Sequence, residues 1–289
     1  MIKKISFSTK GQSADIGELK IHRILPNRYT DAVGHFVFLD HVFPQKTSLL
    51  LNTGTGGHPH RGIATLSYLI EGEGEHFDSA GNHAKVYSGG IQWMKAGKGI
   101  IHDETFNVDS KTGADSKHGF QFWINLPSKN KAENPEYLAI QSNEVPQKKL
   151  LNGSVSIKVI LGSYEDLTSV IPTYSEQFLY HIKVEPGKSF ILPVAEKIEV
   201  AAFLPIKNAI INGIEFQTAE FIEFDRDAGD ILIENKLQEI TDVILFGGEP
   251  YTEPIVAEGP FVMNSKSDIV EAYRDYYAGA YGKIDKNLG

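Results

Sequence analysis

Two short stretches of this 289-residue chain each carry a pair of potential metal ligands separated by one residue. The first pair is His58 and His60, and the second is His102 and Glu104. Because side chains alternate between the two faces of a β-strand, each pair is expected to project from one face, and the residue between its members points away. If the two strands face each other across a barrel, three imidazoles and one carboxylate converge. The spacing therefore predicts a four-ligand metal site.

The chemistry open to such a site is narrowed by the absence of cysteine from the sequence. Disulfides, thiolate catalysis and Cys-ligated zinc or iron–sulfur sites are excluded. One divalent transition metal would be held by nitrogen and oxygen, a ligand set that suits iron, manganese, nickel, copper or zinc without choosing among them. Such sites keep open positions where water or an oxygen-containing substrate binds.

The histidines are concentrated in the first part of the chain, since nine of the ten lie at or before His118. This distribution favours a metal site in the first domain. A pair of surface histidines in a glycine-rich loop is the alternative interpretation of the first pair, and the repeated spacing favours the metal site. His76 and His83 are expected to face solvent. His118 is a candidate hydrogen-bond partner of a ligand, and His181 is expected to be a hydrogen-bonded structural histidine.

Short apolar stretches separated by Gly, Asn, Asp and Pro indicate strands and turns, first over residues 5–125 and again over residues 155–246. The intervening residues 127–149 are polar and contain three prolines, which marks a domain connection. The pattern predicts an all-β protein with an N-terminal metal-binding domain at residues 1–138. A second all-β domain without metal ligands is expected at residues 139–289.

The end of the chain has a different pattern. Ser265 to Asp268 fits a helix-start capping box. Ile269, Ala272, Tyr273 and Tyr276 then recur at helical spacing. One short C-terminal helix is predicted, with its aromatic side chains used for packing.

Charge and hydropathy exclude several classes of function. The formal net charge is −9 and the basic residues are scattered, which argues against direct binding of nucleic acid but allows a protein partner. No apolar run reaches the length of a membrane span, and the first eight residues lack the apolar region of a signal peptide. A soluble cytoplasmic protein is expected.

Several motifs together resemble the pirin family of the cupin superfamily. The resemblance covers nearly the whole chain, and its most specific part is the run from Gln92 to Glu104. The matching stretches are Leu39–His41, His58–Gly62, Tyr68–Glu73, Asp78–Asn82, Gln92–Glu104, Gln121–Pro127 and Gly259–Asn264.

This resemblance implies a bicupin: two antiparallel cupin β-barrels, jelly-roll-like, with one metal site in the N-terminal barrel. The family's ligands fall on the positions of His58, His60, His102 and Glu104, and the metal is typically iron. Bacterial members include quercetin 2,3-dioxygenases, which open a flavonol ring with dioxygen and release carbon monoxide. The family often carries Glu where this chain has Ala64, so a changed pocket or changed ligand surroundings are expected there.

The leading hypothesis is an iron-dependent dioxygenase that takes quercetin or a similar aromatic hydroxy-carbonyl substrate together with dioxygen. Glu104 would be both a ligand and, once detached, the general base for the substrate hydroxyl. The resemblance also implies an alternative, because some eukaryotic members are redox-dependent regulators that act through protein partners. A third alternative is a cupin barrel that has lost its metal.

Overall fold

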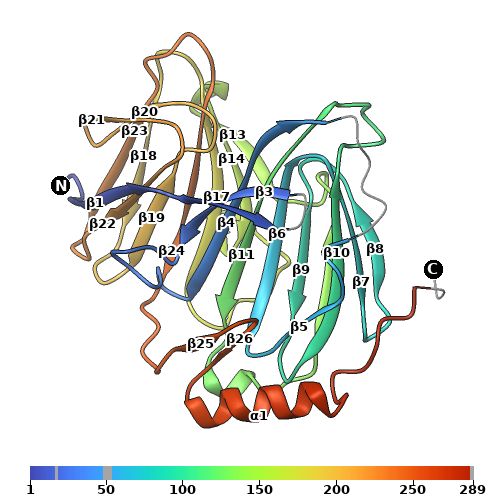
Figure 1. The fold of residues 1–289 in the computed structure, drawn as a ribbon. Coiled ribbons are helices and arrows are strands. Elements are labelled where there is room, and N and C mark those ends of the chain that lie inside the picture. Colours follow the sequence, from blue (N-terminus) through green and yellow to red (C-terminus); the bar gives the residue numbers. More distant parts are fainter. Residues whose placement is uncertain (17–18, 48–53, 287–289) are drawn as a thin grey trace. The chain divides into compact units, whose positions relative to one another are not determined.

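The computed structural model describes residues 1–16, 19–47 and 54–286, and strands dominate it (Figure 1). The chain divides into two compact units. We call the unit that contains the predicted ligands the histidine unit; it comprises Ala14–Ile21, Phe38–Glu144 and Thr252–Gly289. The other, the apolar unit, comprises Met1–Ser13, His22–Val37 and Val145–Tyr251. The predicted all-β bicupin class with one short C-terminal helix is confirmed.

Residues of the histidine unit form most of a seven-stranded sheet, in the order β12-β9-β6-β11-β4-β3-β2, and a four-stranded sheet, in the order β5-β10-β7-β8. Neighbouring strands are antiparallel wherever their register is described. The strands of these sheets are β2 (Gln12–Ile16), β3 (Leu19–Leu25), β4 (Phe36–Lys46), β5 (His58–His60), β6 (Ile63–Glu71), β7 (Glu73–Asp78), β8 (His83–Val86), β9 (Ile91–Lys95), β10 (Ile100–Asn107), β11 (Ser116–Asn125) and β12 (Glu136–Ile140). The short 3-10 helix η1 (Ser128–Asn130) follows β11.

The apolar unit repeats this plan with a seven-stranded sheet, β1-β22-β19-β24-β17-β14-β13, and a four-stranded sheet, β18-β23-β20-β21. A small hairpin, β15-β16, and the 3-10 helix η2 (Leu151–Gly153) complete it. The strands are β1 (Ile5–Lys10), β13 (Gln147–Leu150), β14 (Val155–Leu161), β15 (Ser163–Tyr164), β16 (Leu167–Thr168), β17 (Gln177–Val184), β18 (Ser189–Val194), β19 (Glu199–Phe203), β20 (Ala209–Ile211), β21 (Ile214–Phe216), β22 (Glu220–Phe224), β23 (Gly229–Glu234) and β24 (Thr241–Gly248).

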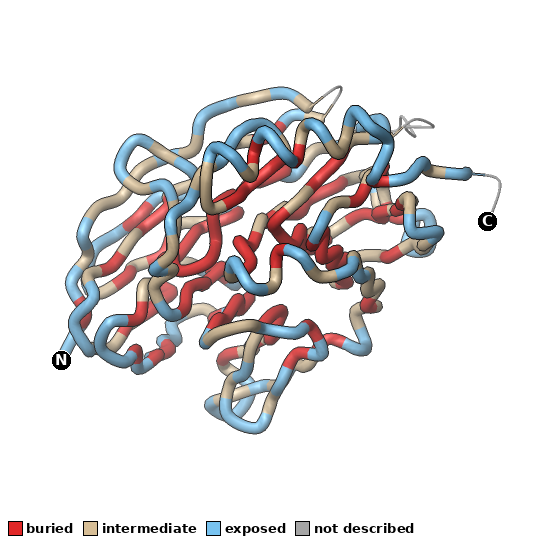
Figure 2. The backbone as a smooth tube through the Cα atoms, turned by 90° about the horizontal axis from the view of Figure 1, so that it is seen from below, coloured by how far each residue is buried: buried red, intermediate tan, exposed pale blue. Residues whose placement is uncertain are grey.

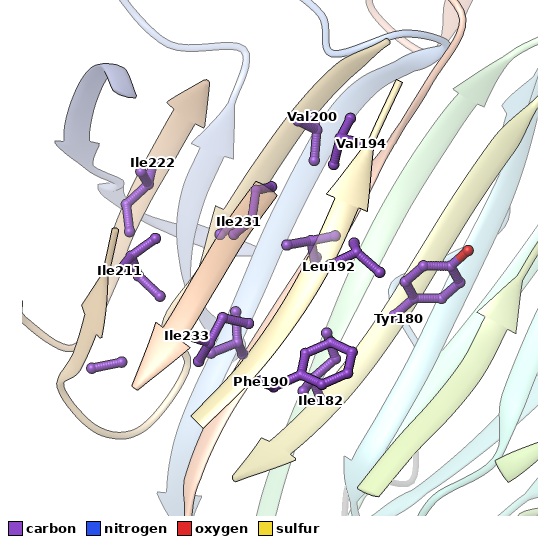
Figure 3. Close-up of a cluster of buried hydrophobic side chains, with 14 of the residues drawn as sticks. Tyr180, Ile182, Phe190, Leu192, Val194, Val200, Ile211, Ile222, Ile231 and Ile233 are labelled. Atoms are coloured by element: carbon purple, nitrogen blue, oxygen red, sulfur yellow. The ribbon is translucent and has the colours of Figure 1, made fainter. Parts of the chain in front are cut away.

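The interior of the apolar unit is filled by hydrophobic side chains from both of its sheets. Phe190 and Leu192 on β18 point toward the same interior as Tyr180 and Ile182 on β17 (Figure 3). Alternation along β18 is clean, because its buried residues are every second one. This unit therefore uses its barrel interior for a packed core.

The last part of the histidine unit consists of the hairpin β25 (Val256–Glu258) and β26 (Phe261–Met263), followed by α1 (Lys266–Tyr277). The Ser265 side chain accepts a hydrogen bond from the backbone N–H of Asp268 at 3.2 Å, which confirms the predicted helix start. Ile269 and Ala272 are buried against Phe261, whereas much of the helix is exposed or only partly buried (Figure 2). Among the described residues, no helix has both the length and the apolar character needed to cross a membrane.

These compact units differ from the single division predicted between residues 138 and 139. Thr252–Gly289 clusters with Phe38–Glu144, and Met1–Ser13 clusters with Val145–Tyr251. The physical reason is contact between segments that are far apart in the sequence. Strand β1 pairs with β22, and the carbonyl oxygen of Pro260 accepts a hydrogen bond from His60 on β5. Local periodicity carries no information about such pairing.

Candidate metal centre

Three of the four predicted ligands form one group, which we call the three-histidine group: His58, His60 and His102. Their potential ligand atoms all lie within 4.8 Å of one another, and the Nε2 atoms of His58 and His102 are 2.9 Å apart. The arrangement considered for their convergence, two strands that face each other across a barrel, is not the one found for β5 and β10. They are antiparallel neighbours in which His102 is directly opposite His58, so the imidazoles project from one face of one sheet.

The surroundings of these imidazoles fit them to bind a metal cation. His60 and His102 are buried, and burial lowers the pKa of His60 to about 3 and holds the pKa of His102 well below its ordinary value. The Nδ1 atoms of His58 and His60 lie 2.8 and 3.1 Å from the carbonyl oxygens of Gly56 and Pro260. A carbonyl only accepts hydrogen bonds, so Nδ1 of each ring carries a proton, and in the neutral ring Nε2 then keeps its lone pair. Neutral imidazoles with free Nε2 lone pairs are the form that ligates metal.

Glu104, the fourth predicted ligand, lies beside the three-histidine group. Its Oε2 atom is 3.7 Å from Nδ1 of His102, and its ligand oxygen belongs to a second group with His102 and His76. Two neutral donors from the seven-stranded sheet hold the carboxylate: Gln121 Nε2 at 3.0 Å and Ser67 Oγ at 3.4 Å. Gln121 and Ser67 are direct cross-strand partners on β11 and β6, which places both donors at the same level of the sheet.

His76 does not face solvent, contrary to the expectation from its sequence surroundings. It is 0% exposed, its Nε2 lies 3.1 Å from Oδ2 of Asp78, and its ring stacks on that of Tyr137 at 4.1 Å. The signal that sequence reasoning missed is alternation along β7, where Gly74, His76 and Asp78 are all buried. A carboxylate that orients a buried imidazole is the usual companion of a metal-binding histidine.

The other histidines have partners away from these groups. His83 is exposed, as predicted. His181 is buried, with Nε2 2.7 Å from Oδ1 of Asp242, in agreement with the predicted structural role. His118 is buried, and its Nε2 lies 2.9 Å from Nε2 of His41.

An aromatic wall adjoins the three-histidine group on the side of the seven-stranded sheet. The ring of Trp123 meets that of His60 edge-on at 4.9 Å and stacks on Phe38 at 4.2 Å. Gln121 and Trp123 therefore belong to the face of β11 that is turned toward the ligands. Phe122 and Ile124 alternate with them on the opposite, apolar face.

Ala64 lies on that opposite face. It is directly opposite Ile124 in the register between β6 and β11, and cross-strand partners share a face. Its neighbour Thr65 is opposite Trp123, on the ligand side. The register therefore does not support the expectation that Ala64 changes the ligand surroundings, because its side chain lies on the opposite face, beside Ile124 on β11 and Lys95 on β9.

The family model described as Pirin matches residues 18–124, and the model described as the Pirin C-terminal cupin domain matches residues 179–282. A pirin-like protein of Caulobacter vibrioides is 34% identical over 95% of this chain and 94% of its own length. Human pirin is 32% identical over 77% of this chain and 76% of its own length.

Solved structures agree with these matches. The crystal structure of a quercetin 2,3-dioxygenase from Acinetobacter baumannii has a TM-score of 0.90 and 28% identity. The match covers 99% of this chain and 100% of that one. A bacterial pirin from Escherichia coli, solved in complex with nickel(II), has a TM-score of 0.64 at 21% identity, covering 85% of this chain and 99% of that one, which is a likeness of fold.

Proposed function

The chain belongs to the pirin family, and on that basis we propose that it is an iron-dependent dioxygenase that opens the ring of quercetin or a similar flavonol with dioxygen. In this reaction both atoms of dioxygen enter the ring-opened ester, and one ring carbon leaves as carbon monoxide together with its oxygen. The observation that carries the proposal is the convergence of three imidazoles, with a carboxylate beside them. The similarity to the Acinetobacter baumannii quercetin 2,3-dioxygenase supports the choice of substrate.

We assign the metal to His58, His60, His102 and Glu104. When bound, an iron ion would supply Lewis acidity and a path for electrons between the substrate and dioxygen. The protein would contribute imidazole nitrogens whose lone pairs are not occupied by protons and are therefore available to the metal. The proton on Nδ1 of His60 is engaged by the Pro260 carbonyl, so the ring is already in the tautomer that binds through Nε2.

Glu104 is the group best placed to accept the proton of a substrate hydroxyl. Gln121 and Ser67 hold its carboxylate with hydrogen bonds from neutral donors, which orient it without neutralising its charge. Burial and the nearby charge of Glu104 raise the pKa of Tyr137, so its phenol stays a neutral O–H donor near the same carboxylate. The substrate oxygen would thus meet one acceptor and one donor.

A flat ring has an apolar surface available next to these polar groups. Trp123 is held in place by its stack on Phe38 and stands edge-on to His60. Aromatic faces favour stacking or edge contacts with a planar ligand and exclude water from the reacting atoms. We propose that the Trp123 side of the site receives the aromatic part of the substrate.

The direct test is anaerobic reconstitution with Fe(II), followed by addition of dioxygen and quercetin. Loss of the flavonol absorption with formation of carbon monoxide and the ring-opened ester is expected. Glu104→Gln removes the charge and the base at nearly constant shape, and we expect kcat to fall by at least about 100-fold, as for loss of a general base. Gln121→Met, which removes one donor to Glu104, is expected to reduce kcat less, by about 10-fold.

The matched control is His83→Ala, which removes an exposed histidine from the same unit and should leave turnover unchanged. Full occupancy by iron with no ring-opened product from quercetin or several other flavonols would overturn the proposed reaction. Unchanged kcat in the Glu104→Gln variant would overturn its role as base.

A further inference from the structure

The last described residues of the histidine unit, Pro260 to Lys286, bond to the strands that carry the predicted ligands; we call them the C-terminal segment. Its first contact is with a ligand itself, because the Pro260 carbonyl lies 3.1 Å from Nδ1 of His60. The backbone N–H of Val262 then donates to the carbonyl oxygen of Arg61 at 3.2 Å. The residue that fixes the tautomer of His60 is thus 200 positions away in the sequence.

The side chain of Arg61 makes a second connection to this segment. One of its terminal nitrogens lies 2.8 Å from Asp275 and the other 2.9 Å from Glu271, both on α1. The Arg61 side chain is only 12% exposed, so these carboxylates provide much of the compensation for its burial. Arg61 directly follows His60, and its position is therefore tied to the helix.

Two glycines next to the ligand strands show how closely the segment approaches. A Cβ atom on Gly62 would lie 2.1 Å from the carbonyl oxygen of Val262, and φ at Gly62 is +83°. A Cβ atom on Gly99, where φ is +129°, would lie 2.1 Å from the ring of Tyr281. Glycine is required at both positions for close approach and for backbone conformation. Gly62 ends the stretch that begins at His58, and Gly99 directly precedes β10.

The end of the segment contacts β10 and the turn that supports it. Lys286 Nζ lies 2.6 Å from Oδ2 of Asp103, the residue between His102 and Glu104. Ser79 Oγ donates to the carbonyl oxygen of Tyr281 at 2.5 Å and accepts from the backbone N–H of Ile101 at 3.1 Å. Each side of the three-histidine group is thus fastened to the same segment.

We propose that the C-terminal segment is part of the metal centre. Arg61, which contacts this segment, and Tyr281 and Lys286, which belong to it, are positioning residues for His60 and β10. The inference rests on the proposed metal site and goes beyond it. Docking of the segment and binding of the metal are then linked: a variant with weakened docking binds metal less tightly, and bound metal holds the segment more tightly.

The direction of the change in metal affinity distinguishes a positioning role from a purely electrostatic effect. Arg61→Met and Lys286→Ala each remove a positive charge near the site, which by itself would strengthen binding of a cation. Loss of positioning instead predicts weaker binding, by about 10-fold for Arg61→Met, as is typical when a partner of a ligand is lost. A smaller fall is expected for Lys286→Ala, because its side chain is 53% exposed. Arg61→Lys restores the charge but not the simultaneous contacts with Asp275 and Glu271, so it should recover the metal affinity only in part.

Co(II) titration followed by visible absorption measures this affinity without any turnover. The matched control is Lys283→Ala, which removes the same charge from an exposed position three residues before Lys286. It should bind Co(II) as the wild type does. If Arg61→Met is poorly folded, Lys286→Ala still decides the question, and circular dichroism of each variant reports the fold.

Hydrogen exchange provides the reciprocal measurement. Co(II) is expected to slow exchange at the Val262 and Ile101 amides in the wild type, and less so in Lys286→Ala. Unchanged Co(II) affinity in both Arg61→Met and Lys286→Ala, or tighter binding, would overturn the inference while leaving the proposed reaction standing. Weakened binding in these variants of a protein that never opens a flavonol would support the inference and overturn the reaction. A wild type that binds no metal would overturn both.

Discussion

At the scale of single residues, the position of protons on the imidazoles decides whether the site is ready for a metal. The Nδ1–H groups of His58 and His60 donate hydrogen bonds to backbone carbonyl oxygens, and burial keeps His60 and His102 neutral. Neither His60 nor His102 must lose a proton before it can ligate, which limits the competition between protons and metal.

Replacing His58 by alanine tests the site most directly. One of three converging imidazoles is lost, so the metal affinity should fall by more than the roughly 10- to 100-fold expected when only a supporting partner is removed. Elemental analysis of protein purified without a metal-binding tag measures the bound metal. His83→Ala, at an exposed position, should retain the wild-type content. Equal metal content in the His58→Ala and wild-type proteins would refute the site.

Lys131 belongs to the same scale, although its role is structural. Its ammonium group donates to three oxygens: the carbonyls of Gly62 and Val262 at 2.9 and 2.7 Å, and Asn125 Oδ1 at 2.5 Å. Lys131→Met keeps most of the side-chain volume but leaves these buried acceptors without that donor. The free energy of unfolding is expected to fall by about 3 kcal/mol, since each unsatisfied buried group costs roughly 1–3 kcal/mol.

Urea denaturation measures this loss, and Lys129→Met is the control because Lys129 is exposed in η1. A difference between the two variants below about 0.5 kcal/mol, the usual range for surface changes, would show that the three contacts contribute little.

At the scale of elements, side-chain alternation gives the two faces of one sheet different roles: one packs in an apolar layer and the other faces the ligands. On β11 the residues Phe120, Phe122 and Ile124 pack into an apolar layer, while Gln121 and Trp123 reach the ligands. The same alternation on β6 turns Ser67 toward Glu104 and Ala64 away from it. A single-residue shift in register would exchange these faces, so register is as important to the site as the ligands are.

A partly buried carboxyl group on a strand of the apolar unit is expected to produce a measurable pH dependence. Burial, reinforced by the charge of Glu199, raises the pKa of Glu223 on β22 to about 7, against an ordinary value of 4.5. Between these pH values the folded protein holds a proton that the unfolded chain has released, so the free energy of unfolding falls as pH rises. Glu223→Gln cannot ionise and should remove this decline.

The measurement is urea denaturation of wild type and Glu223→Gln at about pH 5 and about pH 8. The variant is expected to be the more stable protein at the higher pH, with a smaller difference at the lower pH. A stability difference that is the same at both pH values would contradict the assignment.

At the scale of the whole molecule, two barrels of the same plan use their interiors differently. In the part of the chain that the structure describes, both potential metal-ligand groups lie in the histidine unit. The apolar unit fills the corresponding space with side chains such as Phe190, Leu192 and Ile233. Its interior is therefore a packed core, and neither of the two potential metal-ligand groups found among the described residues lies in it.

Metal-linked stabilisation should follow this division. A metal that binds only the folded state stabilises it by about 4 kcal/mol at a free concentration a thousand times the Kd. Hydrogen exchange with and without Ni(II) should show the added protection on β5, β7 and β10, and not on β17 to β24. Protection that is equal in both units, or that persists in the His58→Ala protein, would contradict a site confined to the histidine unit.

The sequence by itself determined the fold class, the short C-terminal helix and the identity of the ligand candidates, because these depend on local spacing. Side chains along a strand repeat every two residues, which brings His58 and His60 to one face. Ser265 caps the helix through a local hydrogen bond that does not depend on the tertiary structure. The absence of cysteine restricted the chemistry to nitrogen and oxygen ligands.

Only the tertiary structure decided which segments meet. It made β5 and β10 neighbours, buried His76 beside Asp78, turned Ala64 away from the ligands, and brought Pro260 to His60. These outcomes depend on strand register and on contacts between residues as many as 200 positions apart. Hydrophobic periodicity states that a strand has two faces, but the partner of each face is chosen by packing of the whole chain.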